Sequence, residues 1–173
     1  LEGDIRLAAD RCHFDLRHEG AYFELPAADK QKEGAHLEPY LQLPIEGRMQ
    51  SHLSLFKWGG QHWAPMKTVS TLTPGKWTIR LDEAALCAVQ TTGKVILEAD
   101  NITVDLEHEA HKEALDPTLA CLLAKSGIID GRFNLEGRLA GRAPPEMLLQ
   151  SLGGNFKFKA KDGRINRFDL LGR

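Results

Sequence analysis

The segment NFKFKAK, residues 155–161, indicates the fold most clearly, because apolar and lysine side chains alternate along it. A β-strand points successive side chains to opposite faces, so one face of this segment is apolar and the other is basic. Residues 132–139 alternate in the same way. Asp162-Gly163 then predicts a hairpin turn, after which residues 164–170 return as a further strand.

Similar alternation extends over most of the chain and predicts short strands joined by tight turns. The predicted strands are residues 4–8, 12–17, 49–57, 67–72, 77–81, 85–91, 94–99 and 102–107. The turn signals are Glu19-Gly20, Trp58-Gly59-Gly60, Pro74-Gly75, Thr92-Gly93 and Asp100-Asn101. Strands and turns in this order predict an antiparallel meander.

Two segments instead space their apolar residues three and four positions apart, as helices do. The first spans residues 111–125, with Asp116-Pro117 as a helix start, and the second spans residues 144–152 and stops at Gly153-Gly154. The sequence therefore predicts a mainly β (α+β) fold. Residues 1–173 form one domain, a twisted antiparallel meander sheet with two short amphipathic helices. Any part of the apolar face that the helices leave uncovered would form an open groove.

The composition is that of a globular domain, with 42% hydrophobic and 27% charged residues. The net charge is −2, so nucleic acid is not an expected partner. The C-terminal part is nevertheless basic, and fits either a solvated strand face that discourages edge pairing or an anion-binding surface. Its basic residues are Arg138, Arg142, Lys157, Lys159, Lys161, Arg164, Arg167 and Arg173.

The three cysteines, Cys12, Cys87 and Cys121, contain no CxxC motif. In an oxidising compartment we expect one disulfide, for which we choose Cys87 with Cys121, and one free thiol. Three buried thiols packed as small hydrophobic residues are the alternative.

No motif predicts catalysis, a metal or a cofactor, so we expect a protein that is not an enzyme. In EHEAH, residues 107–111, the two histidines are three positions apart, whereas the zinc-protease helix motif separates them by four. The segment is more typical of a charged helix start. Trp58, Trp63 and Trp77 could form a sugar-binding platform, although such residues commonly fill a core.

Residues 82–173 carry a resemblance to the C-terminal region of AsmA-like proteins. The matching segments are GRFNLEG (131–137), PEMLLQSL (145–152), GGNFKF (153–158) and AKDGRI (160–165), and more loosely DEAALC (82–87) and LACL (119–122). The chain begins in strand-like sequence without an initiator Met, so we expect it to be a fragment of a larger protein.

The resemblance implies a non-catalytic module in the envelope of Gram-negative bacteria. AsmA-like proteins are anchored in the inner membrane, project into the periplasm and are implicated in outer-membrane biogenesis and phospholipid transport. Related members form long, open β-sheets with an apolar groove. The implied partners are phospholipid or another acyl lipid, the rest of the parent chain, and the inner membrane through a segment absent from this sequence.

An apolar sheet face can contact acyl chains while its other face remains in water. The candidate lipid-contact residues are Phe133, Leu135, Leu139, Phe156, Phe158 and Ile165. The same residues could form an ordinary core beneath the helices. The alternative function is therefore a structural or protein-interaction module of the cell envelope without a ligand.

Overall fold

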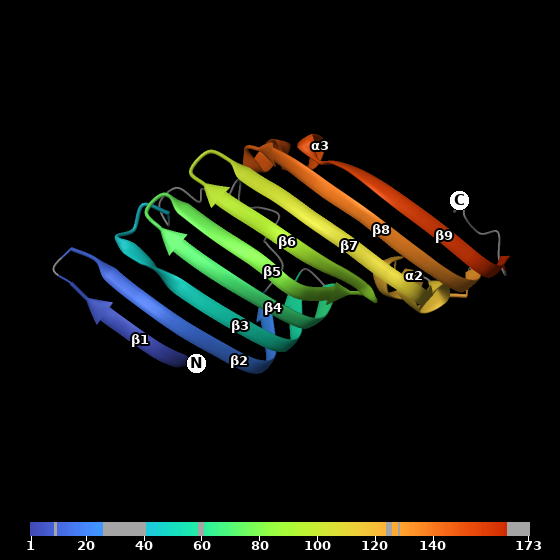
Figure 1. Ribbon diagram of the computed structural model, residues 1–173, viewed down its shortest axis with the longest axis horizontal. Helices are drawn as coiled ribbons and strands as arrows, with labels where there is room; N and C mark the ends of the chain where they lie inside the picture. The colour runs from blue at the N-terminus through green and yellow to red at the C-terminus, as the bar shows by residue number, and fades with distance from the viewer. Residues whose placement is uncertain (9, 26–40, 59–60, 124–125, 128, 166–173) are drawn as a thin grey trace.

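The computed structural model describes residues 1–8, 10–25, 41–58, 61–123, 126–127 and 129–165. These residues form one nine-stranded sheet in which spatial order follows chain order (Figure 1). The strands are β1 (Glu2–Leu7), β2 (Cys12–Leu25), β3 (Ile45–Trp58), β4 (Gln61–Thr73), β5 (Lys76–Leu86), β6 (Val89–Glu98), β7 (Ile102–Ala114), β8 (Ile129–Ala143) and β9 (Gly153–Ile165). The mainly β prediction is confirmed.

Every pair of neighbouring strands is antiparallel except β2 and β3, which are parallel. Cys12 at the start of β2 lies beside Ile45 at the start of β3. A parallel pair needs a connection of a dozen or more residues, and the chain from 26 to 44 provides that length. The meander prediction is therefore correct except at this pair.

Both helices are present but shorter than predicted. Helix α2 spans Leu115–Leu123, because residues 111–114 continue strand β7. The second helical segment consists of a 3₁₀ turn, η1 (Pro145–Met147), followed by α3 (Leu148–Ser151). Pro145 fits the first turn because its missing N–H has no helical partner there.

Three predicted turns are wrong. Thr92-Gly93 lies inside β6, and the β5–β6 hairpin turns instead at Cys87 and Ala88, whose φ angles of 53° and 69° are left-handed. Glu19-Gly20 lies inside β2. Asp162-Gly163 lies inside β9, where the register shift opposite Asp130 and Arg132 marks a β-bulge.

The expected strand at residues 164–170 is described only to Ile165, where β9 ends, and its remainder lies outside the described residues.

The two faces of the sheet differ sharply in chemistry, as rows of register partners reveal. Paired residues of adjacent strands share a face. One row across eight strands contains Ile5, Phe14, Gly47, Leu72, Trp77, Leu97, Ile102 and Ala143. We call this the apolar face.

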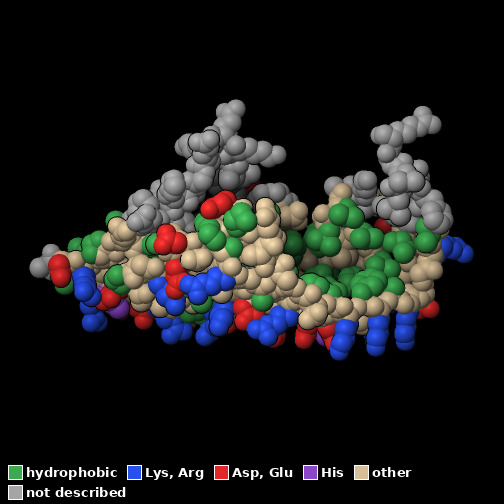
Figure 2. Space-filling model, turned by 90° about the horizontal axis from the view of Figure 1, so that it is seen from above, with side chains coloured by type: hydrophobic (Ala, Val, Ile, Leu, Met, Phe, Trp, Pro, Cys, Tyr) green, Lys and Arg blue, Asp and Glu red, His purple; other side chains and the backbone are tan. Residues whose placement is uncertain are grey.

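The row beside it, on the charged face, contains Asp4, Asp15, Arg48, Thr71, Thr78, Ile96, Thr103 and Arg142. Figure 2 shows hydrophobic side chains along one side of the sheet and Lys, Arg, Asp and Glu side chains along the other.

The sheet has a thin core. No large side chain of the described residues is less than 2% exposed. The main buried cluster lies where α2 packs on the apolar face, and contains Ala110, Leu115 and Phe133. Among the described residues, most side chains of the remaining apolar face are therefore only partly buried.

Candidate functional site

The apolar face of β7, β8 and β9 contains most of the predicted lipid-contact residues. Helices α2 and α3 lie at opposite ends of these strands (Figure 1). Between the helices, register partners bring Ala110, Leu135 and Phe158 into one row and Leu106 and Leu139 into another. We call this part of the apolar face, over β7–β9 between α2 and α3, the open section. Figure 2 shows a hollow among hydrophobic side chains at this end of the sheet.

At the α2 end of the open section, the side chain of Phe133 is buried. Its side chain is only 4% exposed and belongs to the cluster with Ala110 and Leu115. The Phe133 ring stacks on the Phe158 ring, with 5.6 Å between the ring centroids. Phe133 is thus a core residue, and Phe158 extends that packing toward solvent.

At the α3 end, the backbone closes over Gly141. A Cβ at this position would lie 2.9 Å from the carbonyl oxygen of Ser151 and 3.1 Å from the Cα of Leu152. Gly141 pairs with Val104, which places it on the apolar face. Glycine here allows the chain after α3 to lie directly on the sheet.

The exposure of the candidate residues increases from β8 to the edge strand β9. Leu135 and Leu139 on β8 are partly buried. On β9, Phe156 is 51% exposed, Phe158 is 56% exposed and Ile165 is 54% exposed. Ile165 pairs with Ile129 near the α2 end, away from the other exposed residues. Of the six candidates, Phe156 and Phe158 present the largest apolar surface of the open section.

His108 is a residue of the open section that sequence reasoning did not assign to it. The imidazole is half-buried on β7, and its Nδ1 lies 3.0 Å from the Thr91 hydroxyl oxygen. The His108 ring centroid lies 6.0 Å from that of Phe156. Burial lowers the pKa of His108 below its ordinary value, so the ring is neutral at neutral pH. A neutral, partnered imidazole is compatible with an apolar surface.

The segment around His108 also corrects the expected helix start. Residues 107–111 belong to strand β7, where Glu107 and Glu109 lie on the charged face and His108 and Ala110 on the apolar face. His108 and His111 therefore do not share a helix face as metal ligands would. In the part of the chain that the structure describes, no group of three or more His, Cys, Asp or Glu residues could hold a metal ion.

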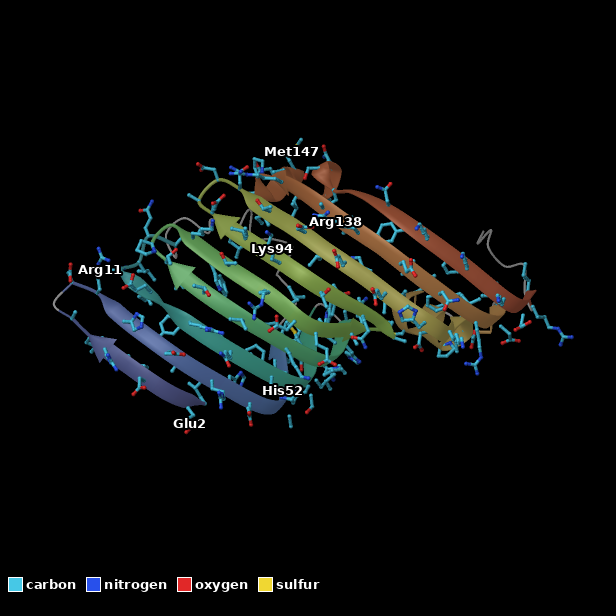
Figure 3. The ribbon with its side chains drawn as sticks, viewed as in Figure 1. Glu2, Arg11, His52, Lys94, Arg138 and Met147 are labelled. Carbon is cyan, nitrogen blue, oxygen red and sulfur yellow. A yellow bond between two sulfur atoms is a disulfide. The ribbon has the colours of Figure 1, made fainter. Side chains whose placement is uncertain are left out.

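The charged face is crossed by ion pairs between strands. The guanidinium of Arg138 on β8 donates to both carboxylate oxygens of Asp105 on β7, at 2.7 and 2.9 Å. This hydrogen bonding holds the pKa of Asp105 below its usual range. Figure 3 labels Arg138 on β8 and Lys94 on β6, on either side of the strand that carries Asp105. Further pairs are Arg142–Glu98, Lys76–Glu98 and Lys67–Glu83.

The predicted disulfide is present between Cys87 and Cys121, and Cys12 is free. It joins the β5–β6 turn to helix α2, which covers one end of the open section. Cys12 faces the apolar side of β2, where it pairs with Leu7.

The sequence left open whether the three tryptophans form a sugar-binding platform or fill a core. Trp63 and Trp77 are both partly buried, and the side chain of Trp58 lies outside the described residues.

No helix within the described ranges is both long enough and apolar enough to span a membrane. Comparison of the chain with family models, with curated proteins and with solved structures gave no match.

Proposed function

We propose that this chain is a non-catalytic module that holds or passes acyl lipid along the apolar face of its sheet. The observation that supports this function is the open section, where Phe156 and Phe158 are more than half exposed beside the partly buried Leu135 and Leu139. Monomeric proteins seldom expose a large contiguous apolar patch unless it is an interaction site.

An acyl chain is a suitable partner for this surface. Each methylene group that leaves water contributes about 0.8 kcal/mol, so a short stretch of chain on the open section provides useful affinity. The imidazole of His108 in this section is hydrogen-bonded to the hydroxyl of Thr91 on the adjacent strand β6, so it does not require a polar ligand. The headgroup remains in water, where the sheet does not enclose it.

The setting we propose follows the AsmA-like resemblance of residues 82–173. That range includes β6–β9 and both helical segments, and therefore the whole open section. In this proposal the module lies in the periplasm of a Gram-negative bacterium, within a protein anchored to the inner membrane. It contributes to phospholipid transport between membranes and to outer-membrane biogenesis.

A lipid-loading experiment tests the proposal. The protein is incubated with detergent-solubilised phosphatidylethanolamine, repurified without detergent and extracted for mass spectrometry. Two variants on one strand provide the comparison, because Phe156 faces the open section and the neighbouring Asn155 faces away from it. We expect Phe156→Glu to carry roughly tenfold less lipid than wild type, since a carboxylate replaces apolar contact area.

The Asn155→Glu variant adds the same charge to the charged face and should load like wild type. Absence of lipid from the wild-type protein, or equal loading of the two variants, would count against the proposal.

A structural or protein-interaction module is the second candidate. Among the strands that the structure describes, β1 and β9 are at the edges and each pairs on one side, so both offer backbone groups to another strand. All six residues of β1 are exposed. If the lipid-loading experiment fails, strand pairing with another part of the parent protein would be the function that this geometry supports.

A further inference from the structure

We propose that the charged face of β9 is a contact surface for anionic lipid headgroups, through which the module meets a membrane. The surface consists of Lys157, Lys159 and Lys161, which we call the lysine row. This inference rests on the proposed function and adds to it the charge class of the lipid and the edge at which lipid reaches the sheet.

The geometry of a β-strand places the three lysines on one face. Alternate residues on one strand lie about 6.5 Å apart, so the three side chains leave the same face at regular intervals. All three are exposed. These intervals are shorter than the Debye length of about 8 Å at physiological ionic strength, so the three charges act together on an anionic surface.

Neighbouring residues on β8 make the row more basic. Lys161 pairs in register with Arg132, Lys159 with Asn134 and Lys157 with Glu136. These two rows of side chains thus contain four positive groups and one negative group. Figure 2 shows Lys and Arg side chains projecting from the charged side at this end of the sheet.

The lysine row also differs from three basic residues of the charged face that are held in ion pairs. Arg138 and Lys67 each form an ion pair with a carboxylate of the neighbouring strand, and Arg142 pairs with Glu98 two strands away. Within the described ranges, the ammonium groups of the lysine row form no ion pair with a carboxylate. Their charge is available to an external anion.

The opposite face of the same strand identifies the kind of anion. Phe156 and Phe158 alternate with the lysines and are more than half exposed on the apolar face. One strand at the open edge of the sheet therefore presents a basic side and an apolar side. An anionic phospholipid has a headgroup for the first and acyl chains for the second, whereas a nucleic acid has no acyl chain.

Vesicle flotation tests this inference with the full chain. Vesicles of phosphatidylcholine alone are compared with vesicles in which phosphatidylglycerol replaces about a third of it. A lysine near an anionic surface contributes about a factor of five to binding, so replacing all three of the row by glutamine should weaken binding roughly a hundredfold. Binding of the wild-type protein should also fall as salt rises.

Matched variants separate position from net charge. The triple glutamine variant of Lys67, Lys76 and Lys94 loses the same charge from β4, β5 and β6, and should bind within about threefold of wild type, because the effect of a charge fades beyond a Debye length. The triple arginine variant of the lysine row should retain binding. Its retention would also show that a loss in the glutamine variant is not caused by misfolding.

Several outcomes would overturn the inference. These are equal binding to both vesicle types, an unchanged affinity of the lysine-row glutamine variant, or equal losses in the two glutamine variants. Self-association of the lysine-row variant without loss of vesicle binding would assign the lysines to edge protection instead. If the variant still loads detergent-solubilised lipid but does not bind vesicles, the lysine row is required for membrane contact and not for holding the acyl chain, which supports the inference.

Discussion

Cys87 in the β5–β6 turn and Cys121 in helix α2 are joined by a disulfide, with 5.6 Å between their Cα atoms. The bond links elements 34 residues apart and fixes α2 over one end of the apolar face. Because the buried cluster beneath α2 is small, the crosslink adds a covalent constraint to the packing of the helix.

Replacing both Cys87 and Cys121 by alanine should lower the free energy of unfolding by about 4 kcal/mol, because the unfolded chain regains the entropy of a loop of this length. Urea denaturation followed by circular dichroism measures the loss. The control Cys12→Ala removes a free thiol and should cost about 1 kcal/mol or less. Similar losses in the double variant and the control would contradict the stabilising role of the disulfide.

Phe133 and Phe158 stack on each other but should respond differently to truncation. Phe133→Ala leaves a cavity in the buried cluster and should cost about 3–5 kcal/mol of stability. Phe158→Ala removes a ring that is already half in water, and should cost about 1 kcal/mol. If urea denaturation gave equal losses, Phe158 would be core and the open section would be smaller than described.

Gly93 should tolerate substitution poorly, although it is not in a turn. Its φ angle is 132°, and an added Cβ would lie 2.2 Å from the carbonyl oxygen of Asp105 on β7. Gly93→Ala should therefore lower the free energy of unfolding by roughly 2–3 kcal/mol. Gly75 lies in the β4–β5 turn, where an added Cβ meets open space, so Gly75→Ala should cost only about 1 kcal/mol. A milder effect at Gly93 than at Gly75 would show that β6 and β7 do not pack as described.

The Asp105–Arg138 pair should make stability depend on pH. The hydrogen bond from Arg138 lowers the pKa of Asp105 in the folded protein, so the pair stabilises the fold above the ordinary aspartate pKa of about 3.9. That contribution is lost as the pH falls through the lower folded pKa. The stability difference between wild type and Asp105→Asn should therefore be largest near neutral pH and shrink in acid.

Denaturation midpoints at a series of pH values from neutral to acid measure this difference for Asp105→Asn. Asp4→Asn is the control, because no ion pair of Asp4 is found in the described residues. A stability difference for Asp105→Asn that did not change with pH would be contrary to the role of the pair.

Much of the fold was predictable because alternation in the sequence is a local property. The side of a strand on which Phe156 or Lys157 lies depends only on whether its position is odd or even. The helix start near Pro117 and the turn at Pro74-Gly75 were likewise recognisable from local residues. These features required no knowledge of neighbouring strands.

The wrong predictions concern residues that look like turn residues in the sequence but whose conformation is required by contacts with another strand. Gly93 resembled a turn residue but allows close approach of two strands, and the left-handed Asp162 creates a bulge and not a hairpin. The parallel pairing of β2 with β3 has no local signal at all. The burial of Phe133 and the exposure of Phe158 depend on where α2 packs, so alternation alone could not predict which ring is more buried.

The proposed function requires that an acyl chain lies on the apolar face of β9. Benzoylphenylalanine introduced at Phe158, or separately at Asn155 on the opposite face, provides the most direct measurement. Each protein is mixed with tritiated phospholipid in detergent, irradiated and separated by gel electrophoresis. We predict a strong lipid adduct from position 158 and a much weaker one from position 155, where only a headgroup on the lysine row would be near. Equal labelling at the two positions, or labelling only at position 155, would contradict the proposed function.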